Sequence, residues 1–422
     1  MHHNEIIKMN NSQLSIKKWS FTSKVIFRFA FSYFALFILL LFLALFIETP
    51  LRWFADTVLN WGADFKMEST GSGDRSFDYV RFALNLLLAF FTTITWTFLD
   101  KKRNSYTALL YWFQTVLRVF LVIAMIIYGL AKVFKGQFAD PSLELLIQPV
   151  GEMSPMGLAW TFMGHSMVYN IFIGSLEIIG GLLLLNRKTV MLGSLLVLGI
   201  MVNVAIMNLT YDIPVKLFSI HLVIMASTLL ITNGKRILSF FFKNEATEKI
   251  HFINYIKNTF LLKMIRFVKK TIITVVSILV IVQCFFNFKA TEQLRSSSKL
   301  RGIWKAEVFV KQQDTIAPLL TDDYRWKYFI IDQKGKAMVK KMNDRIDKYN
   351  FEENSDTKEI IFKDDKNSLS QKFTYQVSNG QLKLQGDLNN NKLSIELKKI
   401  PESEFRLLNR KFHWVNESTY NY

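Results

Sequence analysis

The chain has 422 residues, of which 50% are hydrophobic and 14% aromatic, and its formal net charge is +18. The aromatic content excludes fibrous and disordered proteins, and a single cysteine, Cys284, excludes a disulfide framework or a thiolate zinc site. The basic excess fits either nucleic-acid binding or a membrane protein with basic cytoplasmic loops. The distribution of the apolar residues decides between these two classes.

Seven stretches approach or exceed the roughly 20 apolar residues that a membrane-spanning helix needs. They are Val25–Ile47, Tyr79–Leu99, Leu109–Val133, His165–Leu185, Thr189–Leu209, the shorter Val215–Ile231, and Thr271–Phe288. The first is too long for a cleavable signal peptide and lacks its cleavage site, so we expect it to be retained. The predicted organisation is a tail (1–24), two accessory spans (25–108), a four-helix core (109–231), a basic amphipathic segment (232–270), a seventh span (271–288) and a C-terminal domain (296–422).

The connections between the spans alternate in charge. The tail and the connections after the second, fourth and sixth spans are rich in Lys and Arg, whereas those after the first and third are rich in Asp and Glu. The positive-inside rule then places the N-terminus in the cytoplasm and the C-terminus outside a bacterial-type inner membrane. The net charge is thereby explained by topology and contact with the lipid bilayer, and nucleic-acid binding loses its main support.

Two connections have a pattern of their own. Ile250–Lys270 alternates apolar and basic residues at helical spacing, so we expect an amphipathic helix in the inner interface, which anchors on anionic lipid or binds a regulatory partner. Pro141–Pro149 and Pro155–Trp160 are apolar but too short to span, which is typical of interfacial or re-entrant segments.

Residues 296–422 show about eight short segments of period-two alternation separated by turns, which predicts an extracytoplasmic antiparallel β-barrel. The segments are Ile303–Val310, Trp326–Ile331, Ala337–Met342, Asp347–Phe351, Glu359–Phe362, Lys372–Val377, Gln381–Gln385 and Lys392–Lys398. Asp322–Trp326 is interpreted as the lead into a strand rather than the edge of a mouth. The aromatic residues of Phe412–Glu417 are expected to plug the barrel or to touch the membrane interface.

The start of this domain, Leu300–Trp304, resembles the Gly-x-Trp opening of lipocalin-type barrels. The resemblance implies that Trp304 plugs the barrel floor and that Arg406 or Arg410 packs on its ring. The sequence leaves open whether the barrel holds a ligand or is a rigid cap.

Two ionisable residues fall near mid-membrane on consecutive antiparallel spans, Arg118 and Glu177. Charges in hydrocarbon are costly, and an ion pair between the two helices is easy to form. One alternative is a packing latch. The other is a proton-linked or redox-linked site.

A second polar set lies nearer the outer face of the third to sixth spans. Its members are Tyr128, Lys132, His165, Tyr169, Asn170, Asn203, Asn208, Asp212, Lys216 and His221. Asn203 and Asn208 are expected to face inward, because an amide facing lipid is unpaired. The set could cap helix ends or could hold a quinone head or a small anion. No His-x-x-x-His or Glu-x-x-His spacing supports a metal site.

Within these sets the sequence assigns roles to individual residues. Candidate catalytic residues are Arg118, Tyr128, Lys132, His165, Glu177, Asp212 and His221. Candidate cofactor-binding residues are Tyr169, Asn203, Asn208 and Lys216. The cofactor is unknown, with quinone as the one named alternative.

The four-helix core resembles the DoxX-like family of membrane proteins. The resemblance rests on the Tyr128-Gly129-x-x-Lys132 ending, on Glu177-x-x-Gly180-Gly181 with the turn Arg187-Lys188, and on the turn Asp212–Lys216. It implies a helical bundle, associated in some members with quinone-linked oxidation and in others with oxidant defence. The dithiol chemistry of related proteins does not apply, because only Cys284 is present.

Two functions are therefore carried forward, with a transporter ranked below both because no inverted repeat is present. The first is a membrane oxidoreductase component linked to quinone or to a membrane redox partner. The second is a non-enzymatic membrane scaffold or binding protein whose outer barrel binds a ligand or a partner.

Overall fold

The computed structural model divides the chain into two compact units. The first is built from residues 1–129 and 175–278, and the second from residues 130–174 and 279–422. The residues described are 18–43, 46–61, 72–247, 258–296, 298–363, 370–388, 391–410 and 412–419.

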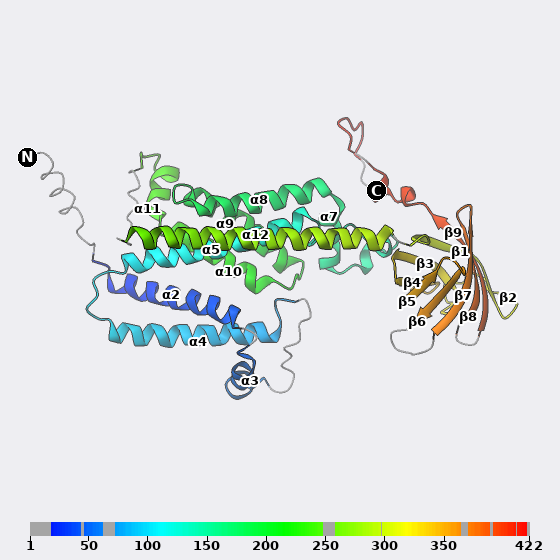
Figure 1. Cartoon of the computed structure of the whole chain (residues 1–422), viewed down its shortest axis with the longest axis horizontal. Helices are drawn as coiled ribbons and strands as arrows, with labels where there is room; N and C mark the ends of the chain where they lie inside the picture. The colour runs from blue at the N-terminus through cyan, green and yellow to red at the C-terminus, as the bar shows by residue number, and fades with distance from the viewer. Residues whose placement is uncertain are drawn as a thin grey trace, which may run out of the picture. The chain divides into compact units, whose positions relative to one another are not determined.

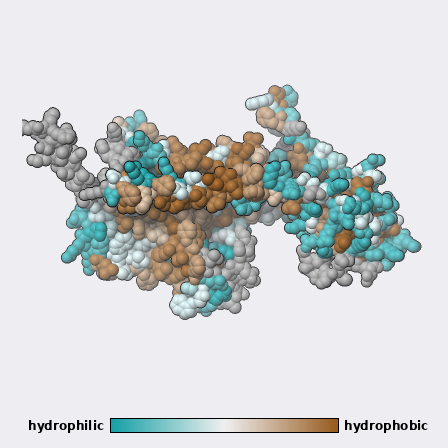
Figure 2. All heavy atoms as spheres, viewed as in Figure 1, coloured by the Kyte–Doolittle hydropathy of each residue, from teal (hydrophilic) through white to brown (hydrophobic). Residues whose placement is uncertain are grey.

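Among the described residues, six helices are long and apolar enough to cross a membrane, and a bent pair brings the number to seven. The six are α2 (Phe21–Phe42), α4 (Ser76–Leu99), α5 (Thr107–Val133), α8 (Met167–Leu185), α9 (Val190–Thr210) and α12 (Thr259–Ser296) (Figure 1). The bent pair is α10 (Lys216–Ile231) followed, after a bend of 76°, by α11 (Gly234–Ile237) and η3 (Leu238–Phe242). Each coincides with a predicted span, so the polytopic helical fold is confirmed. Figure 2 shows mostly hydrophobic residues over the long helices and hydrophilic ones over the strands.

The basic segment before the last span differs from its prediction. Residues 250–257 lie outside the described residues, but from Thr259 the chain forms one continuous helix, α12, through Ser296. No Gly or Pro occurs between these two residues to interrupt the hydrogen-bonded backbone. The described part of the predicted amphipathic segment is therefore helical, but it continues into the apolar span without a break, so its cations lie on the same helix as that span.

The first connection contains a helix that was not predicted, α3 (Glu48–Thr57). Its apolar side chains Leu51 and Phe54 are buried against Phe77 and Val80 of α4. The polar residues on its other face mask this pattern in the sequence. This packing fixes α3 beside the N-terminal end of α4.

In the second unit, the short apolar segments form α6 (Leu143–Leu146), the 3-10 turn η2 (Val150–Glu152) and α7 (Pro155–His165). Serine hydroxyls cap both helices, since Ser142 accepts from the Leu145 amide and Ser154 from the Gly157 amide. The prediction of short, non-spanning segments is confirmed. His165 ends α7 rather than beginning the next span.

All eight predicted strands are present, and they close into a barrel. They are β1 (Gly302–Lys311), β3 (Trp326–Gln333), β4 (Lys336–Lys341), β5 (Ile346–Asn354), β6 (Glu359–Lys363), β7 (Ser370–Ser378), β8 (Gln381–Leu388) and β9 (Asn391–Ile400). Neighbours pair antiparallel in sequence order, and β1 pairs with β9 to close the ring. A two-residue strand, β2 (Asp314–Thr315), pairs only with β1. Asp322 accepts hydrogen bonds from the Tyr324 and Arg325 amides, which confirms that this segment leads into β3.

The barrel interior is filled by its own side chains. Trp326, Phe329, Phe362 and Phe373 pack together with ring centroids 5.4–6.4 Å apart, and all four are nearly or fully buried. An eight-stranded barrel is just wide enough for its interior to be filled in this way. The packing favours the rigid cap over the ligand-holding barrel.

The outer face of the same sheet carries a second, smaller apolar cluster. Ile303 of β1 and Ile330 of β3 point away from the interior and are buried against Leu143 of α6. An ion pair of 3.6 Å between Glu144 and Lys348 borders this contact. The third connection therefore docks on the barrel wall.

Two details of the lipocalin-type prediction are corrected. Trp304 is buried as expected, and its indole N–H donates to the Leu300 carbonyl at 2.8 Å. The cation over its ring is Lys399 of the neighbouring strand, at 5.5 Å, whereas Arg406 begins a short exposed helix, α13 (Arg406–Asn409). Trp414 is 91% exposed, so the C-terminal aromatic residues do not plug the barrel.

Replacing Phe329 by Ala should lower the free energy of unfolding of the barrel by about 3–5 kcal/mol, because it leaves a cavity among the packed rings. Phe412→Ala makes the same chemical change at a side chain that is 75% exposed and should have little effect. Thermal unfolding of the full-length protein, followed by the circular dichroism of the strands, measures both. Equal losses in the two variants would contradict a filled core.

Candidate functional site

Arg118 is buried within α5, as predicted, but its partners differ from the expected carboxylate. Its Nε and Nη2 donate to the Leu184 carbonyl at 2.8 and 2.6 Å, and Nη2 also donates to the Leu185 carbonyl at 3.0 Å. These carbonyls lie at the end of α8, where no following turn of helix supplies N–H groups to donate to them. Glu177 lies seven residues away along the same helix, about 10 Å at a helical rise. Arg118 therefore latches α5 to α8 through main-chain oxygens.

A second buried arginine, Arg28 of α2, makes a similar connection. Its Nη2 donates to the main-chain carbonyl of Asp100 at 2.9 Å, just after α4, and its Nε to the Tyr106 hydroxyl at 2.9 Å. Tyr106 in turn donates to the Asp100 carboxylate at 2.9 Å. Although desolvation opposes it, hydrogen bonds from Tyr106 and Arg103 hold the pKa of Asp100 below its ordinary value. This network was not predicted, because Arg28 lies 72 and 78 positions away in the chain from Asp100 and Tyr106.

Glu177 is buried and lies within electrostatic reach of Tyr128 on α5. The neighbouring glycines permit this close packing: a Cβ at Gly181 would lie 3.0 Å from the Met125 Cβ, and one at Gly180 would lie 3.0 Å from a Val197 methyl. The predicted use of these glycines, a close helix approach beside the carboxylate, is confirmed. The structure thus joins two of the candidate catalytic residues.

His221 is buried in α10, but its partners come from α2 rather than from the predicted four-helix core. Its Nδ1 is 2.6 Å from the Leu217 carbonyl, and its Nε2 is 2.5 Å from the Tyr33 hydroxyl. Because a carbonyl only accepts, Nδ1 carries the proton, so in the neutral ring Nε2 accepts from Tyr33. Phe37 stacks on the imidazole at 4.2 Å. Tyr33 was not predicted, since residues 188 positions apart in the chain share no local pattern.

The outer turn residues Asp212 and Lys216 form an ion pair of 2.7 Å. The more informative contact is Asp74, whose two carboxylate oxygens accept from the amides of Lys216 and Leu217 at 2.7 and 3.0 Å. An acidic side chain on the first amides of α10 neutralises the positive end of the helix dipole. This set therefore caps a helix, which was one of the two predicted alternatives.

The other candidates are dispersed. Asn208 is buried as predicted and its amide lies 3.5 Å from the Val215 carbonyl, but Asn203 is exposed, so its inward orientation is wrong. Asn203 lies beside the exposed apolar residues Val202 and Ile206 of α9. In the second unit, Lys132 is buried 5.9 Å from the centre of the Phe138 ring, whereas His165 and Tyr169 are exposed.

Asn170 is also buried in the second unit, and its amide donates to the Met163 carbonyl at 2.8 Å. This bond ties the start of α8 back to α7. Within the described residues no group of three or more His, Cys, Asp or Glu side chains is placed to hold a metal ion.

The cavity beside His221 is small. It has a volume of about 10 Å³ and is bordered by Phe37, Asn85, Arg81 and Leu217. A cavity of this size holds at most one water molecule. A quinone ring does not fit there without movement of α2 or α4.

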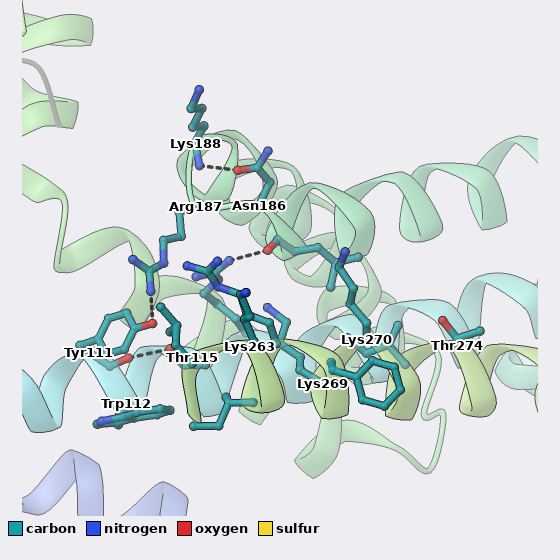
Figure 3. Close-up of a pocket in the computed structure, with 17 residues that line it drawn as sticks. Tyr111, Trp112, Thr115, Asn186, Arg187, Lys188, Lys263, Lys269, Lys270 and Thr274 are labelled. Carbon is teal, nitrogen blue, oxygen red and sulfur yellow. Dashed lines mark hydrogen bonds between the residues drawn. The ribbon is translucent and has the colours of Figure 1, made fainter. Parts of the chain in front are cut away.

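A much larger pocket lies in the first unit, where sequence reasoning placed no site. It has a volume of about 960 Å³ and is formed by α5, the turn between α8 and α9, and the first half of α12 (Figure 3). Among the residues that the structure describes, seven basic side chains line it and no acidic one does. They are Arg118, Arg187, Lys188, Lys263, Arg266, Lys269 and Lys270.

Aromatic and apolar residues complete this cationic pocket. Tyr111 and Trp112 of α5 lie on one side, and the Tyr111 hydroxyl hydrogen-bonds to the Arg187 guanidinium, which also lies 4.7 Å above the tyrosine ring. Figure 3 shows Lys263, Lys269 and Lys270 on the α12 side. The signal in the sequence was the run of cations over 263–270, which was interpreted as an interfacial helix.

The spans, the buried charges at their ends and the closed barrel define an integral membrane protein with a C-terminal β-barrel domain. No protein-family profile matches the chain, and no solved structure matches it. It is 36% identical over 124 residues to the uncharacterized protein YwoB of Bacillus subtilis (strain 168), a match that covers 29% of this chain and 79% of that protein. The chain belongs to the family of YwoB.

Replacing Arg118 by Met should lower the free energy of unfolding by about 2–3 kcal/mol, because charged hydrogen bonds to two buried carbonyls are lost. Arg52→Met removes an arginine that is half-exposed and paired with Glu48, and should cost less than about 1 kcal/mol. Thermal melting of the purified protein in detergent compares the two. An unchanged melting temperature for Arg118→Met would show that this arginine is no latch.

Proposed function

We propose that this protein is a non-enzymatic scaffold of a bacterial-type inner membrane, with a cytoplasmic N-terminus and an extracytoplasmic barrel that binds a partner on its outer surface. The proposal rests on two observations of the barrel: its own side chains pack in the interior, and its outer wall packs on α6. Its interior is occupied by Trp326, Phe329 and Phe373, and its wall is packed on α6 through Ile303 and Ile330. A barrel whose described interior side chains pack on one another favours a rigid exterior that is presented to a partner.

The membrane-buried charges support the same proposal. Arg118 and Arg28 contact main-chain carbonyls at helix ends, and Asp74 caps α10. Groups bound in this way have structural partners that a catalytic role would have to displace. The loop charges support the orientation, because the basic connections alternate with acidic ones.

Cysteine variants with a membrane-impermeant maleimide that carries a photo-crosslinker test this proposal in a Cys284→Ser background. Gln376→Cys places the label on an exposed position of β7, and Lys243→Cys places it on an exposed position after η3. In intact spheroplasts we expect labelling of the first variant only, and a protein adduct of one defined mass after irradiation.

The two parts of the proposal fail separately in this experiment. Labelling of Lys243→Cys but not of Gln376→Cys would reverse the orientation. Labelling of Gln376→Cys without a discrete protein adduct would contradict the scaffold function while leaving the orientation intact.

A quinone-linked role, as the DoxX-like resemblance implies, is the second candidate. One observation favours it: the Tyr33 hydroxyl and the His221 imidazole form a polar pair between the aromatic walls of Phe37 and Phe82. Such donors beside apolar rings suit a quinone head, provided that the neighbouring helices move apart. The small cavity at this point ranks this role below the scaffold.

Mass spectrometry of a lipid extract, together with the absorption spectrum of the purified protein, distinguishes the two candidates. The scaffold predicts no stoichiometric quinone and the same extract from wild type and from a Tyr33→Phe, His221→Ala double variant. A quinone bound near one per chain in the wild type and lost in the double variant would establish the second candidate.

A further inference from the structure

We propose that the cationic pocket binds the phosphate group of an anionic membrane lipid, a site that goes beyond the scaffold function and does not depend on it. The ligand class follows from three properties of the pocket. These are its unbalanced charge, its free hydrogen-bond donors and its apolar lining.

The charge of the pocket is not neutralised within the described part of the chain. Lys263, Arg266, Lys269 and Lys270 extend from the first three turns of α12, and the pocket lining contains no Asp or Glu. The charges of Arg118 and Arg187 both act on Lys269, so like charges repel one another at the centre of the pocket. An anion placed there removes this repulsion and gains the attraction of several cations at once.

The donors are already oriented. Arg118 uses Nε and Nη2 for the Leu184 and Leu185 carbonyls, which fixes the plane of its guanidinium. Its Nη1 makes no hydrogen bond to any residue that the structure describes, and Arg118 lines the pocket. A planar guanidinium with free N–H groups suits a phosphate oxygen, and the lysine ammonium of Lys269 adds a mobile second contact.

The apolar lining favours a lipid over a soluble phosphate compound. Trp112, Leu262, Phe267 and Ile273 line the same pocket as the cations. Phe267 is 69% exposed on α12, at the start of the apolar part of that helix. The phosphate of a lipid would contact the cations of such a pocket, and its acyl chains would contact the apolar side chains. Basic pockets between spans on the cytoplasmic side of membrane proteins bind anionic head groups in this way.

The positive-inside rule by itself does not account for this arrangement. That rule needs basic residues in loops, and Lys235 and Lys243 satisfy it at exposed positions outside the pocket. Arg118, in contrast, lies 11 residues inside α5 and is 8% exposed, and Lys269 is partly buried within α12. The two α8 carbonyls satisfy part of the Arg118 guanidinium, and an anion in the pocket would offset the remaining cost of placing several positive charges together at this depth.

The test uses the full-length protein in nanodiscs of phosphatidylcholine that contain a small fraction of phosphatidylglycerol, with bound lipid counted by native mass spectrometry. The double variant Arg266→Gln, Lys269→Gln removes two cations from the pocket. The matched control, Lys235→Gln with Lys243→Gln, removes two cations outside it. We expect the pocket variant to bind phosphatidylglycerol roughly tenfold more weakly, and the control to bind it like the wild type.

Further arms distinguish the source of the phosphate and guard against misfolding. Soluble glycerol phosphate at millimolar concentration should not displace the lipid; displacement would assign the pocket to a soluble phosphate compound and overturn the lipid part of the proposal. Equal retention of phosphatidylglycerol and phosphatidylcholine by the wild type would overturn all of it. If the pocket variant does not fold, the salt dependence of lipid binding by the wild type decides, since it should weaken steeply as ionic strength rises.

Discussion

Hydrocarbon contains no water to satisfy the ends of a helix, and this constraint determines where the buried charges of this protein lie. Arg118 donates to the last carbonyls of α8, Arg28 donates to the carbonyl that follows α4, and Asp74 accepts from the first amides of α10. Each charge has the sign that complements the helix dipole at that end. The bundle is thus held together by side chains from one segment that complete the backbone hydrogen bonding of a helix elsewhere in the chain.

This arrangement changes the meaning of a charge in a membrane span. An ionisable residue inside a membrane span usually indicates a functional site, and on that ground Arg118 and His221 were among the predicted candidates. Their contacts show instead that a helix end, or a tyrosine on another helix, meets the polar requirement. The cationic pocket differs because seven basic side chains and no acidic one are found in its described lining. We therefore distinguish the proposed binding site from a helix latch by its excess of positive charge, because both contain buried cations.

The sequence predicted those features that depend on local pattern. Apolar length located the spans, and period-two alternation located all eight barrel strands. It did not predict features that depend on contacts between distant residues, such as Tyr33 with His221 or Lys399 over Trp304. The expected ion pair between Arg118 and Glu177 is wrong for a related reason. Depth in the membrane does not specify which carbonyl or carboxylate lies nearest to a buried arginine. The cations of α12 were recognised, but their pattern is the same in a separate interfacial helix and in a continued span.

The pairing of β1 with β9 joins residues that are nearly a hundred positions apart, and it leaves the barrel without an open edge. Every strand before β9 can pair with its predecessor as it emerges, but the ring stays open until the last strand arrives. During that interval β1 and β8 each expose a row of unpaired amides and carbonyls, which is a template for association with other chains. A chain that ends before Asn391 would carry both edges permanently. The tolerance of this protein to C-terminal truncation is therefore set by β9, and a truncation that removes this strand matters more than one that removes only residues 401–422.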